Sequence, residues 1–375
     1  MKVILILAIG FLPNIGGLET HLKDLIEELI KDNWKVIVLT YQPLHTPILG
    51  KWVESSKNLK VYRLPSFRGL FYKLLKIPLL EFIFLEPLLF VTTPIVLILN
   101  PKISIINGQG IIAGFSAAFW SKIFGKRYVV AVQSVYHFPK SGLYRQISRW
   151  IFSSADKVIA ISNQTKKDIE SLGVDPGRVM VYTNWENIEN FKPVNKNKAK
   201  EKIGFKDKFI VSFFGRLVEE KGVNVLLEAI KLSDPKIIFL IYGEGPLKNE
   251  IDKTTKQFKN VKYMGIVSPN ELSLHYSASD MVVMPSLHDE GFGRVAVGAL
   301  LCGTPVIASD KGALPEVINE SVGKIIKPTP EDITGAINFF YTNQIELKKR
   351  ALRAREYAKT KFSNKNAEKI IKIFN

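Results

Sequence analysis

The sequence predicts an α/β protein made of two doubly wound domains, each organised on a parallel sheet. Three observations predict this. The chain has 375 residues, which exceeds the size at which a single hydrophobic core usually divides. Short apolar runs alternate with helix-like segments through both halves, as expected when helices cover both faces of a parallel sheet. A polar, lysine-rich stretch at residues 194–208 separates the two alternating series.

The first series begins with a continuous apolar run at residues 3–10, which we expect to be a strand covered on both faces. Helical periodicity follows at residues 18–30, and the next strand is expected at 35–40. Later strands of the same sheet are predicted at residues 102–107, 128–133 and 157–161.

Residues 71–99 are strongly apolar and contain Pro78, Pro87 and Pro94. A spanning helix needs about 20 largely uninterrupted apolar residues, and the prolines, together with two glutamates, argue against one. Two interpretations remain. The segment forms a pair of buried helices, or it forms an apolar surface that dips into a membrane interface, helped by Lys73 and Lys76.

The second series follows the lysine-rich stretch. Strands are predicted at residues 209–214, 236–242, 261–264, 281–284 and 305–308, and helices at 222–232, 246–256, 269–277 and 294–302. The last unit is a strand, a glycine-broken loop at residues 289–293, a helix and a further strand. Residues 346–374 are helical and charged in pattern.

The distribution of charge, cysteine and histidine argues against a nucleic-acid-binding protein and against a zinc protein. Residues 1–190 carry 22 basic and 14 acidic side chains, and residues 191–375 carry 30 and 21, within a net charge of +17. This even spread favours general attraction to phosphates and acidic lipids over a nucleic-acid footprint. We expect the single cysteine, Cys302, to be a buried structural thiol. The five histidines are scattered, so a protein-ligated zinc site is not expected.

Residues 1–13 are similar in composition to a short signal peptide. They lack a small-residue cleavage site and run directly into Gly16 and Gly17. We therefore expect them to form a buried strand, and we expect the protein to be cytoplasmic.

Seven short segments occur in a characteristic order. They are residues 13–19, 155–162, 184–193, 214–222, 243–247, 264–267 and the loop and helix at 289–302. A helix N-terminus such as the last one presents unpaired N–H groups and a partial positive charge, which attract an anion. Together the seven segments make the chain similar to GT-B glycosyltransferases, in particular the large retaining group called group 1 glycosyltransferases. The resemblance covers nearly the whole chain.

The resemblance implies two Rossmann-like domains facing a cleft. Residues 1–190 would form the N-terminal acceptor-side domain and residues 191–355 the C-terminal nucleotide-sugar-binding domain, with a helix at about 356–375 able to pack back on the first. The implied reaction moves a sugar from a nucleotide-sugar donor to an acceptor hydroxyl with retention. The apolar stretch at residues 71–99 and the basic charge add further expectations: a glycan or lipid-linked acceptor in surface glycan or glycolipid assembly, and a peripheral membrane surface on the cytoplasmic face. Nucleic acid is not expected.

The resemblance also assigns roles to residues. The donor diphosphate should meet cations and backbone N–H groups, and Arg216 and Lys221 correspond to the family's diphosphate-binding pair. Glu290 corresponds to a carboxylate that orients the donor sugar, and these three are the predicted catalytic residues. The other predicted donor contacts, mostly through backbone groups, are Gly16, Gly17, Val267, Gly291, Phe292, Gly293, Arg294 and Val295.

No Asp-x-Asp pair occurs in the sequence, which agrees with a family in which Arg, Lys and a helix dipole replace a metal ion. We expect no cofactor, because the nucleotide sugar is a substrate. In the family's proposed front-face reaction the departing diphosphate oxygen helps to deprotonate the acceptor hydroxyl, and the protein stabilises the leaving group. Alanine at Arg216 or Lys221 is expected to remove donor binding and leave the fold intact.

Three places depart from the family pattern. A second carboxylate, which binds the ribose hydroxyls, is expected eight residues after Glu290, and this chain has Gly298 there. Gly298→Glu is therefore expected to strengthen nucleotide binding, and no gain would mean a rebuilt pocket. Gln133 stands where many members have a histidine near the reacting sugar, and His137 is a candidate substitute. Residues 184–187 read Asn-Trp-Glu-Asn where the family commonly reads Asn-Gly-Val-Asp.

These departures leave two other functions open. One is a non-catalytic subunit of the same fold, which binds a sugar nucleotide or a partner without turnover. Gly298 and Gln133 favour it, whereas Arg216, Lys221 and Glu290 favour the enzyme. The other is a sugar-nucleotide epimerase, although the Gly-Gly-x-Glu and Glu-Gly-Phe-Gly segments are closer to the transferases.

Overall fold

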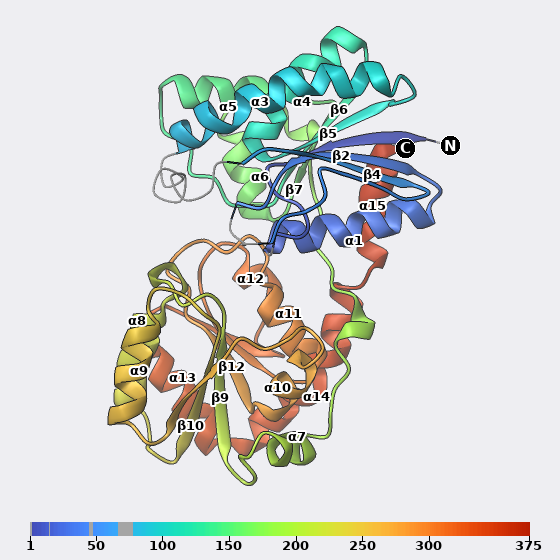
Figure 1. The fold of residues 1–375 in the computed structure, drawn as a ribbon. Helices are drawn as coiled ribbons and strands as arrows, with labels where there is room; N and C mark the ends of the chain where they lie inside the picture. Colours follow the sequence, from blue (N-terminus) through green and yellow to red (C-terminus); the bar gives the residue numbers. More distant parts are fainter. Residues whose placement is uncertain (1, 15, 45–47, 67–77) are drawn as a thin grey trace. The chain divides into compact units, whose positions relative to one another are not determined.

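The computed structural model describes residues 2–14, 16–44, 48–66 and 78–375. Contacts divide the chain into two compact α/β units, Met1–Asn184 with Asn366–Asn375, and Trp185–Lys365 (Figure 1). The boundary therefore falls after Asn184 instead of after residue 190, and the return to the first unit begins at Asn366 instead of at about 356. Residues just after the boundary belong to the second unit because the Phe191 ring packs 6.2 Å from that of Tyr276.

The N-terminal unit contains an eight-stranded sheet of order β3-β4-β2-β1-β5-β6-β7-β8. Neighbouring strands are parallel except the edge pair β3–β4, which is antiparallel. Every residue of the central strand β1 is buried, as its continuous apolar run predicts. The strands are β1 Val3–Leu7, β2 Lys35–Tyr41, β3 Val53–Ser55, β4 Leu59–Leu64, β5 Ile105–Gln109, β6 Arg127–Val132, β7 Lys157–Ala160 and β8 Val179–Val181.

Helices cover both faces of this sheet. Figure 1 shows α3, α4 and α5 on one side of it and α1 and α15 on the other. The C-terminal helix α15 is held there by Arg127, whose guanidinium donates to the carbonyls of Ile373 and Phe374. The helices are α1 Gly17–Lys31, α3 Pro78–Leu99, α4 Gly110–Phe124, α5 Leu143–Ser153, α6 Asn163–Glu170 and α15 Lys365–Phe374, with 3₁₀ turns at Pro176–Arg178 and, in the second unit, Ile188–Asn190 and Glu219–Lys221.

The apolar stretch at residues 71–99 forms a single helix within the described residues. Helix α3 runs through Pro87 and Pro94 without a break. The prediction of a pair of buried helices is therefore wrong for residues 78–99, and a third of the apolar window in this helix is buried. Lys73 and Lys76, for which a role at a membrane interface is predicted, lie outside the described residues.

The C-terminal unit contains a six-stranded, wholly parallel sheet of order β11-β10-β9-β12-β13-β14. The predicted strands 209–214 and 281–284 are found with those bounds. The strands are β9 Phe209–Phe214, β10 Ile237–Tyr242, β11 Val261–Gly265, β12 Met281–Met284, β13 Val306–Ser309 and β14 Gly323–Ile326. The helices are α7 Lys196–Lys202, α8 Val223–Lys231, α9 Lys248–Gln257, α10 Leu272–Ala278, α11 Arg294–Leu301, α12 Leu314–Val317, α13 Pro330–Thr342 and α14 Gln344–Lys361.

The order of the second sheet brings three of the sequence segments to one place. Strands β10, β9 and β12 are adjacent and parallel, so their carboxyl ends lie at the same edge. The chain leaves these ends through residues 243–247, 215–222 and 285–293. Ligands of open α/β sheets bind at such edges.

Candidate functional site

Three loops at the carboxyl edge of the second sheet are tied together by backbone hydrogen bonds. The loop that follows β9 is bonded on one side to the loop after β10 and on the other to the loop after β12. The bonds are Gly215 N to Tyr242 O at 3.1 Å, Leu217 N to Glu244 O at 2.9 Å and Leu287 N to Glu220 O at 2.9 Å. The backbone of the middle loop is therefore held in a fixed position.

Two glycines allow these loops to approach closely. Gly222 has a φ of +71°, and a Cβ there would lie 1.8 Å from the carbonyl oxygen of Pro285. Gly293 has a φ of +87°, and its Cβ would lie 2.8 Å from Leu314 Cδ2. Both positions combine a left-handed conformation with a lack of space, so only glycine fits.

An ion pair joins two of the predicted catalytic residues. Lys221 Nζ lies 2.6 Å from Glu290 Oε1, and Ser286 Oγ donates to the same oxygen at 2.5 Å. The ring nitrogen Nε2 of His288 lies 3.9 Å from Glu290 Oε2. The Glu290 residue is only 8% exposed, whereas the Lys221 side chain keeps 22% of its surface exposed. Ser286 is a site residue that no motif marked.

The pairing decides the charge of Glu290. Burial alone would raise the pKa of this carboxyl, but the Lys221 ammonium, with hydrogen bonds from Lys221 and Ser286, outweighs burial and lowers the pKa below its ordinary value of 4.5. The carboxylate is therefore ionised at neutral pH. It can accept hydrogen bonds from a bound hydroxyl group.

Burial and the Lys221 ion pair have opposite effects on the pKa of Glu290. The pH dependence of stability should therefore reverse when Lys221 is replaced. In the native protein the lowered pKa of Glu290 contributes stability above pH 4.5, and this contribution is lost as the pH falls below that value. In Lys221→Met burial dominates, so the pKa of Glu290 rises and acidification from neutral pH relieves the buried charge. Chemical denaturation between about pH 3 and pH 7 measures both effects. The Glu290-dependent part of the stability should fall with acidification below pH 4.5 in the native protein and rise with acidification above pH 4.5 in Lys221→Met. This part is obtained by subtracting the same pH series for Glu290→Gln and for Lys221→Met/Glu290→Gln. Parallel slopes would contradict the pairing.

Arg216 lies on the same middle loop, five residues before Lys221. Its side chain is exposed, and within the described ranges its guanidinium makes no ion pair. The neighbouring backbone groups of Gly215 and Leu217 are both held by the loop after β10. Arg216 is therefore a cation on a fixed backbone with its donors available to an external anion.

The N-terminus of α11 opens from the same loop as Glu290. Gly293 precedes the helix, and no side chain caps it. The Phe292 ring is buried against Phe362 at a centroid distance of 5.6 Å, which anchors the loop. Gly291 and Val295 are half-buried around this N-terminus. The uncapped N–H groups and the helix dipole favour an anion there.

Two predicted donor residues lie apart from this group. The Arg294 side chain forms an ion pair with Glu186, with Nε–Oε1 at 2.7 Å. The departure Asn-Trp-Glu-Asn therefore supplies the partner of Arg294 in the second unit, a role that sequence reasoning missed. Val267 lies half-buried in the loop after β11.

The side of α11 that carries Gly298 is filled by aromatic rings. A Cβ at this position would lie 2.9 Å from Tyr276 Cε2 and 3.0 Å from Phe191 Cε1. Tyr276 is 3% exposed, so its ring has little room to move. The space that a second carboxylate would need is therefore occupied, and the expectation that Gly298→Glu restores a contact does not fit the structure.

Comparison with known proteins decides the family. A family model described as glycosyl transferases group 1 matches residues 195–361, and one described as glycosyltransferase family 4 matches residues 15–189. This chain belongs to the group 1 glycosyltransferases. A Klebsiella pneumoniae protein described as an uncharacterized 41.2 kDa protein in the cps region is 30% identical to it over 70% of this chain and 75% of the relative.

Other relatives of this glycosyltransferase agree. The gpi3 subunit of phosphatidylinositol N-acetylglucosaminyltransferase from Schizosaccharomyces pombe is 25% identical over 90% of this chain and 72% of its own length. Sucrose-phosphate synthase from Thermosynechococcus elongatus has the same fold, with a TM-score of 0.80, 21% identity and coverage of 100% of this chain and 98% of that one. Anabaena Alr3699/HepE in complex with UDP has a TM-score of 0.79, 20% identity and coverage of 100% and 99%. The GT-B fold is therefore confirmed.

The remaining predicted residues of the glycosyltransferase lie in its N-terminal unit. Gly16 precedes α1, and a Cβ there would lie 2.3 Å from Glu19 Oε2, whereas Gly17 has open space around its Cα. Glu19 Oε1 in turn accepts from Asn14 Nδ2 at 2.6 Å, so the Glu19 carboxylate ties the first turn of α1 to the loop that precedes it.

Gln133 follows β6 and lies in a hydrogen-bonded group at the carboxyl edge of the first sheet. Tyr182 Oη donates to Gln133 Oε1 at 2.7 Å and lies 3.4 Å from His21 Nε2. Sequence reasoning missed Tyr182 and His21, because neither falls within a motif that it had assigned to the site. His137 is exposed on the loop after Gln133.

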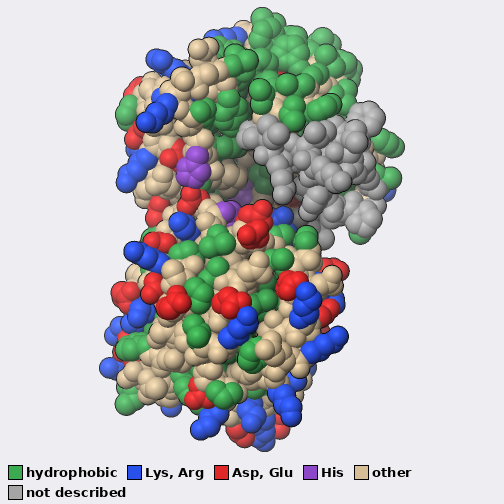
Figure 2. All heavy atoms as spheres, turned by 90° about the vertical axis from the view of Figure 1, so that its left-hand side faces the viewer, with side chains coloured by type: hydrophobic (Ala, Val, Ile, Leu, Met, Phe, Trp, Pro, Cys, Tyr) green, Lys and Arg blue, Asp and Glu red, His purple; other side chains and the backbone are tan. Residues whose placement is uncertain are grey.

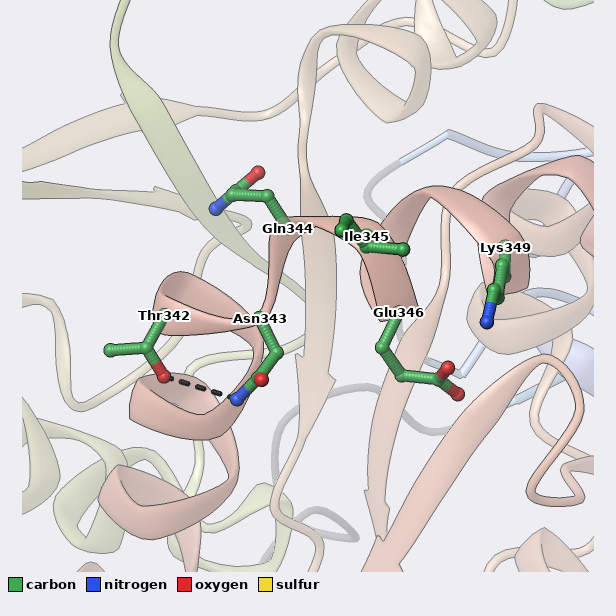
Figure 3. Close-up of a pocket in the computed structure, with 6 residues that line it drawn as sticks. All are labelled: Thr342, Asn343, Gln344, Ile345, Glu346 and Lys349. Atoms are coloured by element: carbon green, nitrogen blue, oxygen red, sulfur yellow. Dashed lines mark hydrogen bonds between the residues drawn. The ribbon is translucent and has the colours of Figure 1, made fainter.

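A surface hollow elsewhere in the second unit carries none of this chemistry. Figure 3 shows it where α13 ends and α14 begins. Its lining residues are Thr342, Asn343, Gln344, Ile345, Glu346 and Lys349. Lys349 is the one cation among the described residues of this lining, and Glu346 is paired with Arg350, so cations do not converge there as they do at the sheet edge. Across the described ranges, no three His, Cys, Asp or Glu side chains are grouped so that they could hold a metal ion.

Proposed function

We propose that this protein transfers a glycosyl group from a nucleotide-sugar donor to an acceptor hydroxyl, with retention of configuration and without a metal ion. The observation that carries the proposal is the convergence of three features at one sheet edge. They are the exposed Arg216, the Lys221–Glu290 ion pair and the uncapped N-terminus of α11. Membership of the group 1 glycosyltransferases supports the reaction class.

The chemistry of these groups fits a sugar diphosphate. The diphosphate carries about two negative charges, and Arg216, Lys221 and the helix dipole supply complementary positive charge. Stabilising the charge that develops on the departing diphosphate is the largest contribution such groups make to catalysis. Glu290, ionised and fixed by Lys221 and Ser286, accepts hydrogen bonds from hydroxyl groups of the donor sugar.

The proposed product belongs to glycan or glycolipid assembly. The supporting relatives are a protein of a Klebsiella pneumoniae cps region and a subunit of a phosphatidylinositol N-acetylglucosaminyltransferase. Proton NMR of the product formed from an α-linked donor tests retention, because an α-configured product supports it and a β-configured product contradicts it. Undiminished turnover in excess EDTA supports metal independence, and loss of turnover that Mg²⁺ or Mn²⁺ restores contradicts it.

Arg216→Ala should weaken donor binding without affecting stability. The side chain is exposed and holds no ion pair in the described ranges, so its removal leaves no buried charge behind. Loss of a charge-assisted contact to the diphosphate should cost about 1.5–3 kcal/mol, or roughly ten- to a hundredfold in Kd. Isothermal titration with the donor measures the change, and Arg353→Ala, an exposed arginine on α14, is the matched control. Equal affinity in the two variants would remove Arg216 from the site.

One observation favours the non-catalytic subunit as a second candidate. The space at Gly298, where relatives of this family bind ribose through a carboxylate, is filled by Tyr276 and Phe191. A subunit of this kind would bind the sugar nucleotide without releasing nucleoside diphosphate. Measuring nucleoside diphosphate release with and without acceptors distinguishes the two functions, since the transferase alone releases it in an acceptor-dependent manner.

A further inference from the structure

Helix α3 has two apolar faces, and one of them is exposed. Leu85, Leu89, Val96 and Leu97 pack into the core of the N-terminal unit. The opposite face carries large apolar side chains that are between 41% and 67% exposed: Leu79, Ile83, Val91, Ile95, Ile98 and Leu99. A surface helix of a globular protein normally has polar residues on its outer face. This face is therefore suited to an apolar environment.

The exposed face is long and continuous. Within residues 79–99, an 18-residue window has a mean hydropathy of 2.3. At about 1.5 Å per residue the 22-residue helix is roughly 33 Å long. It continues onto α4 through Phe90, whose ring lies 5.0 Å from that of Phe119, and Ile123 adds a further exposed side chain. Figure 2 shows hydrophobic side chains gathered over the part of the N-terminal unit where α3, α4 and α5 lie in Figure 1.

Several polar groups of α3 find partners within the protein. Pro94 has no N–H to donate to Phe90 O, and this carbonyl instead accepts from Trp120 Nε1 at 2.9 Å. The hydroxyl groups of Thr92 and Thr93 donate to the carbonyls of Leu88 and Leu89. A helix that faces hydrocarbon needs its polar groups satisfied in this way.

The two acidic residues of α3 do not interrupt its exposed face. Glu86 is buried, and its Oε1 accepts from Ser116 Oγ at 2.6 Å. Burial raises the pKa of Glu86 to about 8, although the Ser116 bond opposes the rise. Glu81 is half-buried. Burial also raises the pKa of Glu81. Neither glutamate is among the exposed apolar side chains that form the stripe.

Basic residues outnumber acidic ones in the segment that carries this apolar face. Residues 78–153 contain seven basic side chains, and their only acidic ones are Glu81 and Glu86. Lys102 and Lys122 are exposed beside the C-terminal ends of α3 and α4. A second copy of the chain would place this positive charge against itself, whereas anionic lipid headgroups complement it.

We propose that α3 lies in the plane of a membrane interface, with its exposed stripe in the acyl-chain boundary and with Lys102 and Lys122 on anionic headgroups. One face of the helix packs on protein, so lipid cannot surround it, and this geometry favours an in-plane helix over a spanning one. The proposal rests on the N-terminal unit alone and is independent of the donor site.

Vesicle flotation of the full-length protein tests the proposal. The protein should float with phosphatidylcholine vesicles that contain phosphatidylglycerol and less with phosphatidylcholine alone. The variant Val91→Gln/Ile95→Gln/Ile98→Gln should bind vesicles at least about tenfold more weakly. The matched control, Leu232→Gln/Ile345→Gln/Leu352→Gln, removes three exposed apolar side chains of the C-terminal unit and should float as the native protein does. Circular dichroism verifies that each variant is folded.

A second measurement separates insertion from adsorption. The only native cysteine, Cys302, is buried, so Ile95→Cys can be labelled with an environment-sensitive dye, with Leu352→Cys as control. Nitroxide-labelled lipids should quench the dye at position 95 and not at 352. Absence of native flotation, undiminished flotation of the triple variant, or unquenched dye would each overturn the proposal. Resistance to alkaline carbonate extraction would show a spanning helix, and a vesicle-free dimer dissociated by the triple substitution would assign the face to a second copy.

Discussion

Replacing Lys221 with alanine should lower the rate of glycosyl transfer by about a hundred- to a thousandfold, the usual effect of removing one preorganised charge from a developing anion. It should also lower stability, because Glu290 would remain ionised and buried without its partner. We expect a loss of only about 2 kcal/mol, since one fifth of the Lys221 side chain is solvated and the pair is therefore not fully buried. Steady-state kinetics and chemical denaturation measure the two effects.

The control for this prediction is Lys231→Ala. Lys231 forms an ion pair of the same 2.6 Å length with Glu228, but both side chains are exposed on α8. Exposed pairs contribute little, so this variant should keep full activity and stability. If Lys221→Ala behaved like Lys231→Ala in both measurements, the assigned role of the Lys221–Glu290 pair would be wrong.

Gly298→Glu should destabilise the protein by about 3 kcal/mol or more and should not improve nucleotide binding. The new side chain would start 2.9 Å from Tyr276 and 3.0 Å from Phe191, so buried rings must move and a carboxylate enters a space with little solvent. Thermal denaturation and isothermal titration with the nucleoside diphosphate measure the two effects.

Gly335→Glu is the matched control. Gly335 also lies within a helix, α13, but it is exposed and no atom lies within 4 Å of a Cβ placed there. Because glycine is unfavourable inside a helix, this substitution should be neutral or stabilising by up to about 1 kcal/mol. A Gly298→Glu protein that is as stable as Gly335→Glu and binds nucleotide more tightly would show that the aromatic rings yield and that the ribose contact can be restored.

Much of the fold could be predicted because its elements are long and patterned. Buried parallel strands such as β1 and β9 are uninterrupted apolar runs, and they were placed within a few residues. The continuity of helix α3 could not be predicted, because prolines such as Pro87 and Pro94 usually end or kink a helix. At Pro94 the helix is supported by Trp120, which donates to the Phe90 carbonyl from 30 residues away in the sequence. Such long-range compensation leaves no local pattern.

The candidate site was predictable to the level of its loops. The order of β10, β9 and β12 brings residues 215–222 and 285–293 together, and the family resemblance assigns both loops to the donor. The direct bond between Lys221 and Glu290 was not predicted, because it joins residues 69 apart on separate loops. The filled space at Gly298 was also missed, since it depends on Phe191 and Tyr276, whose aromatic character alone predicts only burial.

The donor site at the carboxyl edge of the second sheet is tested most directly by titration. The native protein and Arg216→Ala are titrated with a panel of nucleotide sugars and their nucleoside diphosphates. We predict that one donor and its nucleoside diphosphate bind the native protein and raise its melting temperature, since ligand that binds only the folded state stabilises it. Arg216→Ala should melt at the native temperature without ligand and show a greatly reduced shift with it. A native protein that binds no nucleotide sugar, or a variant that binds the same donor with unchanged affinity, would contradict a donor site at this sheet edge.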